Sequence, residues 1–272
     1  MMERSVKAID ATLSDAQVDA PSHAGIVRDR SKTYRSLSIV IPCFNERRWL
    51  PQILERVVAS PVDLDRQVVV VDDGSNDGSQ ALLKELVETH RGRPRLEFEV
   101  IFHEHNRGKG AALRTGFAAA SGDIILVQDA DLEYDPEDYP GLTKPIVDGV
   151  AKVVYGSRWF NRHFHVAHQE RFWFMIGNFV VTHMANLLYR AHITDNATGY
   201  KVFDAEVLKS LPLRCERFEF CSEVTAKLRK RGHKIWEVPI YYYPRSIAEG
   251  KKIGFGDAVE AVWTLIKYRF VD

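Results

Sequence analysis

From residue 37 onward, short apolar runs alternate with longer segments in which apolar residues recur at helical spacing. The runs are too short for helices and rich in β-branched residues, which is typical of buried strands. The strands expected are 37–42, 67–71, 97–103 and 123–128. The helices expected between them are 46–59, 79–90 and 109–120. This alternation predicts an α/β fold, with a mostly parallel central sheet and helices on both faces.

The main domain is expected to span residues 37–243, with a segment of different character on each side. Residues 1–36 have neither an apolar core run nor the pattern of a signal peptide, which predicts a poorly ordered extension. Residues 244–272 join a basic loop to an amphipathic helix, which would pack on the domain or lie at a membrane interface. No stretch has the roughly twenty unbroken apolar residues of a membrane span.

Charge and cysteine content narrow the class of protein. Lysine plus arginine and aspartate plus glutamate both number 37, so the formal net charge is zero. This balance does not support binding of polyanions over the whole surface, and we expect no nucleic-acid partner. The three cysteines, Cys43, Cys215 and Cys221, form no CxxC pair and no even framework. A reducing compartment, and therefore the cytoplasm, is the expected location.

Polar segments follow three of the predicted strands at the point where each strand ends. They are 42–46 (PCFNE), 72–75 (DDGS) and 129–131 (DAD). Ligands of open α/β sheets bind beyond the carboxyl ends of the strands, so these distant segments should line one crevice. The first of them does not read GxGxxG, which disfavours a dinucleotide-dependent oxidoreductase.

Asp129 and Asp131 are two residues apart, and at that spacing in an extended segment their side chains point the same way. Two such carboxylates can hold one Mg²⁺ or Mn²⁺ ion, which prefers oxygen ligands and commonly bridges to phosphates. Glu133 has the same parity and is a candidate third ligand. The alternative is a solvated acidic turn before Pro136, but the buried-strand pattern GDIILVQ directly upstream favours the metal site.

The DDGS segment offers a second pair of carboxylates. Either Asp72 or Asp73 would accept hydrogen bonds from ribose hydroxyls or a base N–H, while Gly74 and Gly78 shape the turn. Residues 106–110 (NRGKG) open a helix, where glycines allow close backbone approach and the helix N-terminus attracts anions. A glycine turn with solvated Arg and Lys side chains is the alternative for that segment.

Four longer motifs follow one another along the chain, namely IVIPCFNE, VVVDDGSNDGS, NRGKGAALRTGF and GDIILVQDADLEYDPE. Further matches lie downstream in GSR at 156–158, DNATGYK at 195–201, FEF at 218–220 and PRS at 244–246. In this order the motifs resemble those of glycosyltransferase family 2, which has the GT-A fold. Within it the chain is similar to dolichyl-phosphate mannosyltransferase-like and other polyprenyl-phosphate glycosyltransferases. The resemblance implies a hexosyltransferase.

The resemblance also implies roles for the matching positions. Those expected to contact the base, ribose and diphosphate of a nucleotide-sugar donor are Pro42, Phe44, Glu46, Asp72 or Asp73, Asp129, Ala130 and Asp131. The diphosphate would be bound through Mg²⁺ or Mn²⁺. Glu133 stands where the family often has Gln, which leaves its part in metal binding open.

Basic residues are expected to face the phosphates of donor or acceptor. The resemblance implies this role for Arg158, Arg245 and Lys252. Arginine suits it because its guanidinium makes two parallel hydrogen bonds to phosphate oxygens. The expected catalytic residues are Asp131, which would hold the cation at the leaving diphosphate, and the two arginines.

The chemical nature of the acceptor separates the candidate functions. The family resemblance implies inverting transfer of a hexose from a donor of GDP-mannose or UDP-glucose type to a polyprenyl or dolichyl phosphate, which is already anionic and needs no general base. A soluble or glycan hydroxyl acceptor would need a carboxylate base, for which Asp195, Glu219 and Glu223 are candidates. Glu223 with Lys227 also fits an ordinary helix salt bridge. A non-catalytic nucleotide-binding protein is the third alternative, which the intact DAD segment disfavours.

Two apolar helices bear on a lipid acceptor. In 171–190, Asn178, Thr182 and Asn186 form one polar stripe, typical of either a core helix with satisfied polar groups or a lipid-facing helix. The face expected to be apolar in the last helix consists of Val259, Val262, Trp263, Ile266 and Phe270. That face would lie in a membrane interface or dock on the sheet. Membrane association would then be peripheral, on the cytoplasmic face, or through a membrane partner protein or a second copy.

Overall fold

The sheet of the computed structural model has seven strands within residues 31–159, 170–244 and 254–272, the part of the chain that the structure describes. In sheet order they are β3 (Leu96–Phe102), β2 (Asp65–Asp72), β1 (Ser36–Cys43), β4 (Ile124–Val127), β6 (Lys201–Asp204), β5 (Val153–Ser157) and β7 (Trp236–Pro239). Strand β6 runs antiparallel to both neighbours, and the other neighbouring pairs are parallel. The predicted mostly parallel α/β sheet is therefore confirmed.

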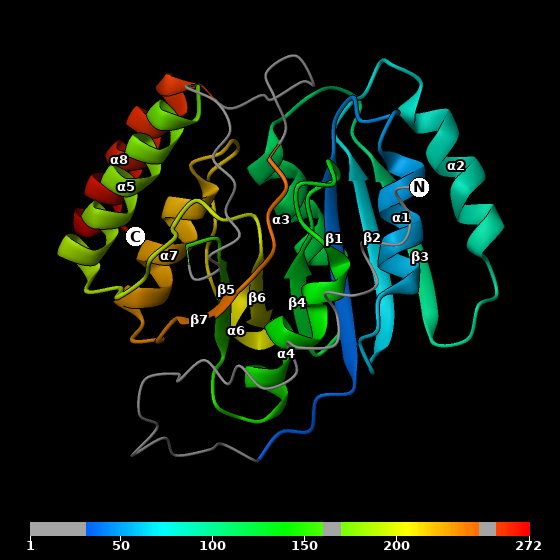
Figure 1. Ribbon diagram of the computed structural model, residues 1–272, viewed down its shortest axis with the longest axis horizontal. Coiled ribbons are helices and arrows are strands. Elements are labelled where there is room, and N and C mark those ends of the chain that lie inside the picture. Colours follow the sequence, from blue (N-terminus) through cyan, green and yellow to red (C-terminus); the bar gives the residue numbers. More distant parts are fainter. Residues whose placement is uncertain (1–30, 160–169, 245–253) are drawn as a thin grey trace, which may run out of the picture.

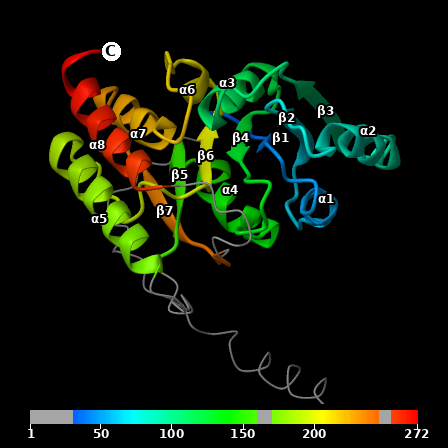
Figure 2. The same ribbon diagram turned by 90° about the horizontal axis from the view of Figure 1, so that it is seen from above.

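Helices cover both faces of this sheet (Figures 1 and 2). They are α1 (Leu50–Ala59), α2 (Ser79–His90), α3 (Lys109–Ala119), the 3₁₀ turn η1 (Pro136–Asp138), α4 (Tyr139–Val147), α5 (Glu170–Tyr189), α6 (Ala205–Lys209), α7 (Phe220–Lys230) and α8 (Phe255–Phe270). The expected start of the first helix at residue 46 is wrong, because Asn45 adopts a left-handed φ of 53° and the helix begins only beside Pro51.

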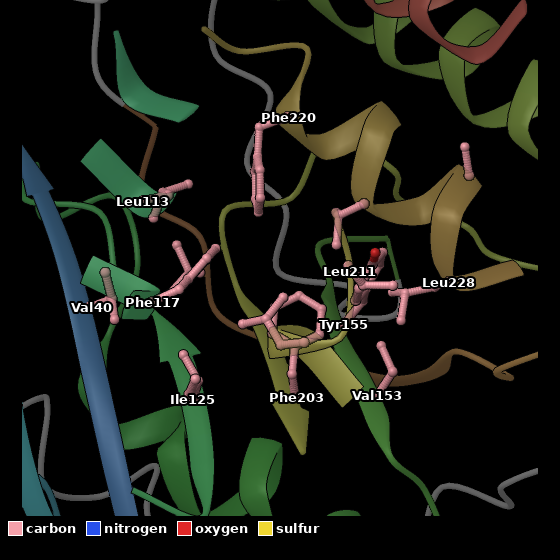
Figure 3. Close-up of a cluster of buried hydrophobic side chains, with 14 of the residues drawn as sticks. Val40, Leu113, Phe117, Ile125, Val153, Tyr155, Phe203, Leu211, Phe220 and Leu228 are labelled. Carbon is pink, nitrogen blue, oxygen red and sulfur yellow. The ribbon is translucent and has the colours of Figure 1, made fainter. Parts of the chain in front are cut away.

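Strand side chains divide between two hydrophobic cores, because successive residues of a strand point to opposite faces. Val40 of β1 packs in the core formed with α3, α5, α7 and α8, where Phe117 and Phe220 approach the sheet (Figure 3). Ile39 and Ile41 belong to the second core, which includes α1 and α4. The valine run at 68–71 is fully buried, as expected for a strand covered on both faces.

Helices α5, α7 and α8 form a separate helical layer at one end of the sheet (Figures 1 and 2). Helix α8, the expected C-terminal amphipathic helix, packs mainly on α5 and α7. The Tyr189 hydroxyl at the end of α5 donates to the Leu265 carbonyl of α8 at 2.6 Å. None of the helices, in the ranges given above, has both the length and the apolar character to cross a membrane.

The chain joins the sheet slightly ahead of the expected domain start at residue 37. Tyr34 is buried, and its hydroxyl donates to Asp204 Oδ2 at the end of β6 over 2.6 Å. Ser36 already pairs with β2. Residues 1–30, most of the expected extension, lie outside the described residues, as does most of the expected basic loop, 245–253.

Candidate functional site

A cavity of about 1170 Å³ lies where the ends of β1, β2 and β4 meet the helical layer. Its lining includes nine of the residues expected at the site, namely Pro42, Phe44, Glu46, Asp73, Asp129, Ala130, Asp131, Glu133 and Arg158. Asp72 does not line it. Arg245 and Lys252 lie outside the described residues. Three segments far apart in the sequence thus meet at one cavity, as the strand-end argument predicts.

Asp129 and Asp131 follow β4 directly and both line the cavity. Leu132 takes a left-handed φ of 61°, and Asp131 Oδ1 accepts a hydrogen bond from the Glu133 N–H at 3.1 Å. Gly199 lies against the first carboxylate, since a Cβ added there would be 2.5 Å from Asp129 Oδ2. The acidic pair is therefore fixed in a tight turn that needs glycine beside it.

Lys109, at the start of α3, pairs with Asp129 over 2.5 Å. Burial disfavours its charge, but Asp129, Cys221 and Asp131 together outweigh burial and leave the pKa of Lys109 above its ordinary value. The NRGKG segment thus places the Lys109 cation at the cavity. The alternative, a glycine turn with solvated Arg and Lys side chains, does not predict this position for Lys109.

The acidic residues of the cavity suit a cation shared with a ligand rather than one enclosed by protein. Within the described residues, no group of three His, Cys, Asp or Glu side chains could hold a metal ion. Glu133 accepts a hydrogen bond from the Tyr242 hydroxyl at 2.9 Å. Mg²⁺ is commonly bound by one or two carboxylates plus substrate phosphates, and Asp129 with Asp131 matches that donor set.

Arg158 follows β5 and is held by a bidentate ion pair. Its Nε and Nη2 donate to the two carboxylate oxygens of Asp195 at 2.6 and 2.7 Å, and Asp195 is fully buried. Burial opposes the arginine charge, but Asp195, together with Tyr134 and Tyr242, outweighs burial and holds the pKa of Arg158 well above its ordinary value. Asn178 of α5 donates to the same carboxylate at 3.0 Å. Arg158 is therefore a fixed cation on the cavity wall.

The two aspartates after β2 have different surroundings. Asp72 Oδ1 accepts from the Ser75 N–H and from Gln80 Nε2, so this side chain stabilises the turn into α2. Asp73 lines the cavity. Its carboxylate accepts hydrogen bonds from the backbone N–H groups of Arg107 (3.0 Å) and Gly108 (2.7 Å), and its Oδ1 lies 2.7 Å from His103 Nδ1. Of the two alternatives, the geometry favours Asp73 as the residue that faces a ligand.

The cavity wall also includes residues 214–220, which sequence reasoning did not single out as a unit. Glu223 of α7 accepts from the N–H groups of Arg214 (2.8 Å) and Cys215 (2.7 Å) and from Lys227 Nζ (2.6 Å). The expected Glu223–Lys227 salt bridge is thus present, but it is buried instead of lying on a solvated face. The Glu216 carbonyl accepts from the Ala111 N–H, which joins this segment to α3.

The polar stripe of α5 holds the segment that carries Asp195. Asn186 bonds both the N–H and the carbonyl of Ile193, at 3.0 and 2.8 Å. Thr182 Oγ1 accepts from the Asn196 N–H, and Asn178 Oδ1 accepts from the Ala197 N–H. The polar groups of the stripe are therefore satisfied within the protein, as expected for a helix packed on the domain, while Phe179 and Leu187 of the same helix are exposed. The signal of the stripe in the sequence was the four-residue spacing of three polar groups on an apolar helix.

Helices α5 and α8 expose several large apolar side chains. These side chains are Ile176, Phe179, Val180 and Leu187 of α5, with Val259, Trp263 and Phe270 of α8 and Val271 after it. Trp263 is 62% exposed. At the C-terminal ends of the helices, a surface pocket is lined by Arg190, Arg229, Lys230 and Arg269. We call these residues together the α5–α8 face.

An open, mostly parallel sheet with an acidic pair at a strand end, lining a large cavity, is the arrangement expected of a glycosyltransferase of the GT-A fold. The model of the family "Glycosyl transferase family 2" matches residues 38–211. The chain belongs to glycosyltransferase family 2.

Relatives and solved structures agree with this assignment. The chain is 29% identical over 237 residues to a UDP-N-acetylglucosamine–dolichyl-phosphate N-acetylglucosaminyltransferase of Methanococcus voltae, covering 80% of this chain and 90% of that protein. It is 28% identical over 224 residues to a dolichol-phosphate mannosyltransferase of Pyrococcus furiosus, covering 80% of this chain but 59% of that protein. In fold it is similar to glucosyl-3-phosphoglycerate synthase of Mycobacterium tuberculosis, solved with Mn²⁺ and UDP. That match has a TM-score of 0.63 at 20% identity and covers 88% of this chain and 81% of the other.

Proposed function

We propose that the protein transfers a hexose, with inversion, from a nucleotide sugar of GDP-mannose or UDP-glucose type to the phosphate of a polyprenyl or dolichyl lipid. The observation that carries the proposal is one cavity lined both by the acidic pair Asp129 and Asp131 and by the fixed cation Arg158. Such a cavity suits a reaction between two phosphate-containing substrates. The names of the relatives from Methanococcus voltae and Pyrococcus furiosus support the lipid acceptor.

On the donor side, Pro42, Phe44, Glu46 and Asp73 would hold the base and ribose at the ends of β1 and β2. Asp129, Ala130 and Asp131 would receive the diphosphate at the end of β4. A bound Mg²⁺ or Mn²⁺ ion would neutralise the charge that grows on the departing diphosphate. Lys109 already lies beside Asp129 and is placed to contact a phosphate oxygen there. These side chains bind and orient the donor before the bond to the sugar breaks.

On the acceptor side, two of the three candidate bases are occupied by structural partners. Asp195 is fully buried and paired with Arg158, and Glu223 is fully buried and paired with Lys227. Both Asp195 oxygens accept from Arg158, and the Glu223 oxygens accept from Lys227 and from the Cys215 N–H, so all four already have donors. The third candidate, Glu219, lines the cavity and keeps one carboxylate oxygen without a partner among the described residues. Support for a lipid phosphate over a hydroxyl therefore comes from the names of the relatives. Arg158, with Arg245 and Lys252 as expected from the sequence, would hold the acceptor phosphate.

We further propose that the α5–α8 face docks on the anionic surface of a membrane, on its cytoplasmic side. Exposed Phe179, Leu187 and Trp263 would enter the interfacial region, and the basic residues at the helix ends would meet anionic headgroups. Docking in this way would bring the cavity, which α5 and α8 also line, close to a lipid phosphate. The free cysteines fit a reducing compartment on that side.

The test is sugar transfer to a short-chain polyprenyl phosphate in the presence of Mg²⁺ or Mn²⁺, with GDP-mannose, UDP-glucose and UDP-N-acetylglucosamine as donors. We expect product with at least one donor and a loss of at least a hundredfold in the double variant D129N/D131N. Asp148→Asn, a charge change on the surface beside Lys144, is the matched control and should retain activity. No transfer from any donor, or full activity in the double variant, would contradict the proposal. Transfer to a sugar hydroxyl instead would favour the alternative acceptor class.

A further inference from the structure

Glu219, the residue that precedes α7, has one buried carboxylate oxygen without a partner. Its Oε1 accepts hydrogen bonds from the N–H groups of Glu216 (3.1 Å) and Arg217 (3.2 Å). Its Oε2 is buried and has no hydrogen-bond partner among the described residues. The residue as a whole is 8% exposed and lines the cavity. Leaving a buried acceptor unpaired costs free energy, so a role for this oxygen is expected in the ligand-bound protein.

Asn196 is a second acceptor of the same kind. It is fully buried and lines the cavity, and its Oδ1 lacks a hydrogen-bond partner within the described part of the chain. Its Nδ2 donates to Ser222 Oγ at 3.3 Å, and the Ser222 N–H in turn donates to the Glu219 carbonyl at 3.0 Å. The two unpartnered acceptors therefore lie around the same first turn of α7.

Two sets of contacts link this turn to Asp129, where the diphosphate would be bound. Gly199, three residues after Asn196, packs against the Asp129 carboxylate. Lys109, which pairs with Asp129, lies 5.9 Å from the centre of the Phe218 ring, next to Glu219. The sugar of a nucleotide sugar is bonded directly to its diphosphate. Its hydroxyl groups would therefore enter the part of the cavity next to Asp129.

We propose that Glu219 and Asn196 form the subsite for the transferred sugar and accept hydrogen bonds from its hydroxyl groups. This inference rests on the proposed function. Both groups are acceptors, so the subsite requires hydrogen-bond donors from the ligand, which sugar hydroxyls supply. The backbone N–H groups that hold Oε1 fix the orientation of the Glu219 carboxylate. A sugar that lacks the matching hydroxyl leaves a buried charge unpaired, so the subsite discriminates among donors.

The experiment separates sugar recognition from nucleotide recognition. Calorimetry on the full chain with Mg²⁺ measures the binding of UDP, of UDP-glucose and of the 3-, 4- and 6-deoxyfluoro analogues of UDP-glucose. If the protein prefers guanine nucleotides, the corresponding GDP-mannose series is used instead. The variant is Glu219→Gln. Glu206→Gln, which removes an exposed carboxylate from α6 outside the residues that line the cavity, is the matched control.

We expect E219Q to weaken UDP-glucose binding about 10- to 100-fold and to leave UDP binding unchanged, as for loss of a hydrogen bond to a charged group. One fluorinated analogue should bind the wild type more weakly than UDP-glucose does, by the same factor. E219Q should bind that analogue no more weakly than it binds UDP-glucose. The inference is overturned if E219Q binds UDP-glucose like the wild type, if it weakens UDP equally, or if every analogue binds the wild type as tightly as UDP-glucose. Failure of the wild type to bind any nucleotide would instead remove the proposed function, and this inference with it.

Discussion

Replacing Lys227 by Met removes one partner of an ion pair enclosed by α7, α8 and residues 212–215. Lys227 Nζ lies 2.6 Å from Glu223 Oε1, donates to the Pro212 carbonyl at 2.6 Å, and lies 4.2 Å from the centre of the Tyr268 ring. The two charged side chains are 2% and 0% exposed, so water cannot replace the missing ammonium group. The variant therefore leaves Glu223 as an uncompensated buried charge.

The expected cost follows from that burial. Breaking a buried ion pair by removing one partner lowers the free energy of unfolding by about 3–5 kcal/mol. In a chain of this size each kcal/mol lowers the melting temperature by roughly 2–4 °C, so K227M should melt about 6–20 °C below the wild type. The double variant E223Q/K227M lacks the stranded charge and should recover part of the loss. The N–H groups of Arg214 and Cys215 donate to different oxygens of Glu223, so only one of them can still donate to the single Gln oxygen and the recovery is partial.

The measurement is thermal unfolding followed by circular dichroism, with nucleotide binding measured on each variant below its transition. Because Glu223 positions the backbone of residues 214–215 on the cavity wall, K227M should also weaken nucleotide-sugar binding. The reasoning is refuted if K227M melts within about 2 °C of the wild type. It is equally refuted if the double variant is less stable than K227M, since removal of the stranded charge would then bring no benefit.

Three further predictions concern pH, the helical layer and the acidic turn. Burial raises the pKa of Asp138 from 3.8 to about 7, so between these pH values the folded protein holds a proton that the unfolded chain releases. The free energy of unfolding should therefore fall as pH rises from about 4 to 7. Urea unfolding at several pH values measures this dependence, which D138N should flatten. Trp263→Glu should stop the protein from floating with phosphatidylglycerol vesicles and leave its binding of soluble nucleotides intact. If the variant floats as well as the wild type, the docking proposal is wrong. Gly199→Ala should push aside Asp129 and lower turnover at least tenfold, whereas Gly141→Ala, with nothing within 4 Å, should be neutral in the same assay.

The parts of the fold that sequence predicts well are those set by local pattern. The valine run at 68–71 and the run ahead of Asp129 identify strands because a strand buried on both faces must be apolar at every position. From these strand ends, the meeting of Phe44, Asp73 and Asp129 at one cavity follows by topology alone. The start of α1 was missed because the backbone conformation of Asn45 is set by the turn it makes over the neighbouring strand end.

The parts that sequence misses depend on contacts between distant residues. Glu223 and Lys227 have the spacing of a surface salt bridge, and only the packing of α8 over them makes the pair buried. Asp72 and Asp73 are equivalent in the sequence, and their roles separate only in the fold, where Asp73 lines the cavity and Asp72 holds the turn into α2. Likewise, no local pattern shows that Glu219 retains an unpartnered oxygen.

Strand β3 forms one edge of the sheet, and its sequence has a consequence for solubility. An edge strand presents unpaired backbone groups on which a strand from another molecule can add. In β3 the exposed positions alternate with half-buried ones and carry Glu97 and Glu99, so a second copy pairing there would bring like charges together. Replacing both glutamates with valine would leave an apolar, unprotected edge. At the high concentrations used for enzyme production, such a variant would be prone to fibrous aggregation although every catalytic residue is unchanged.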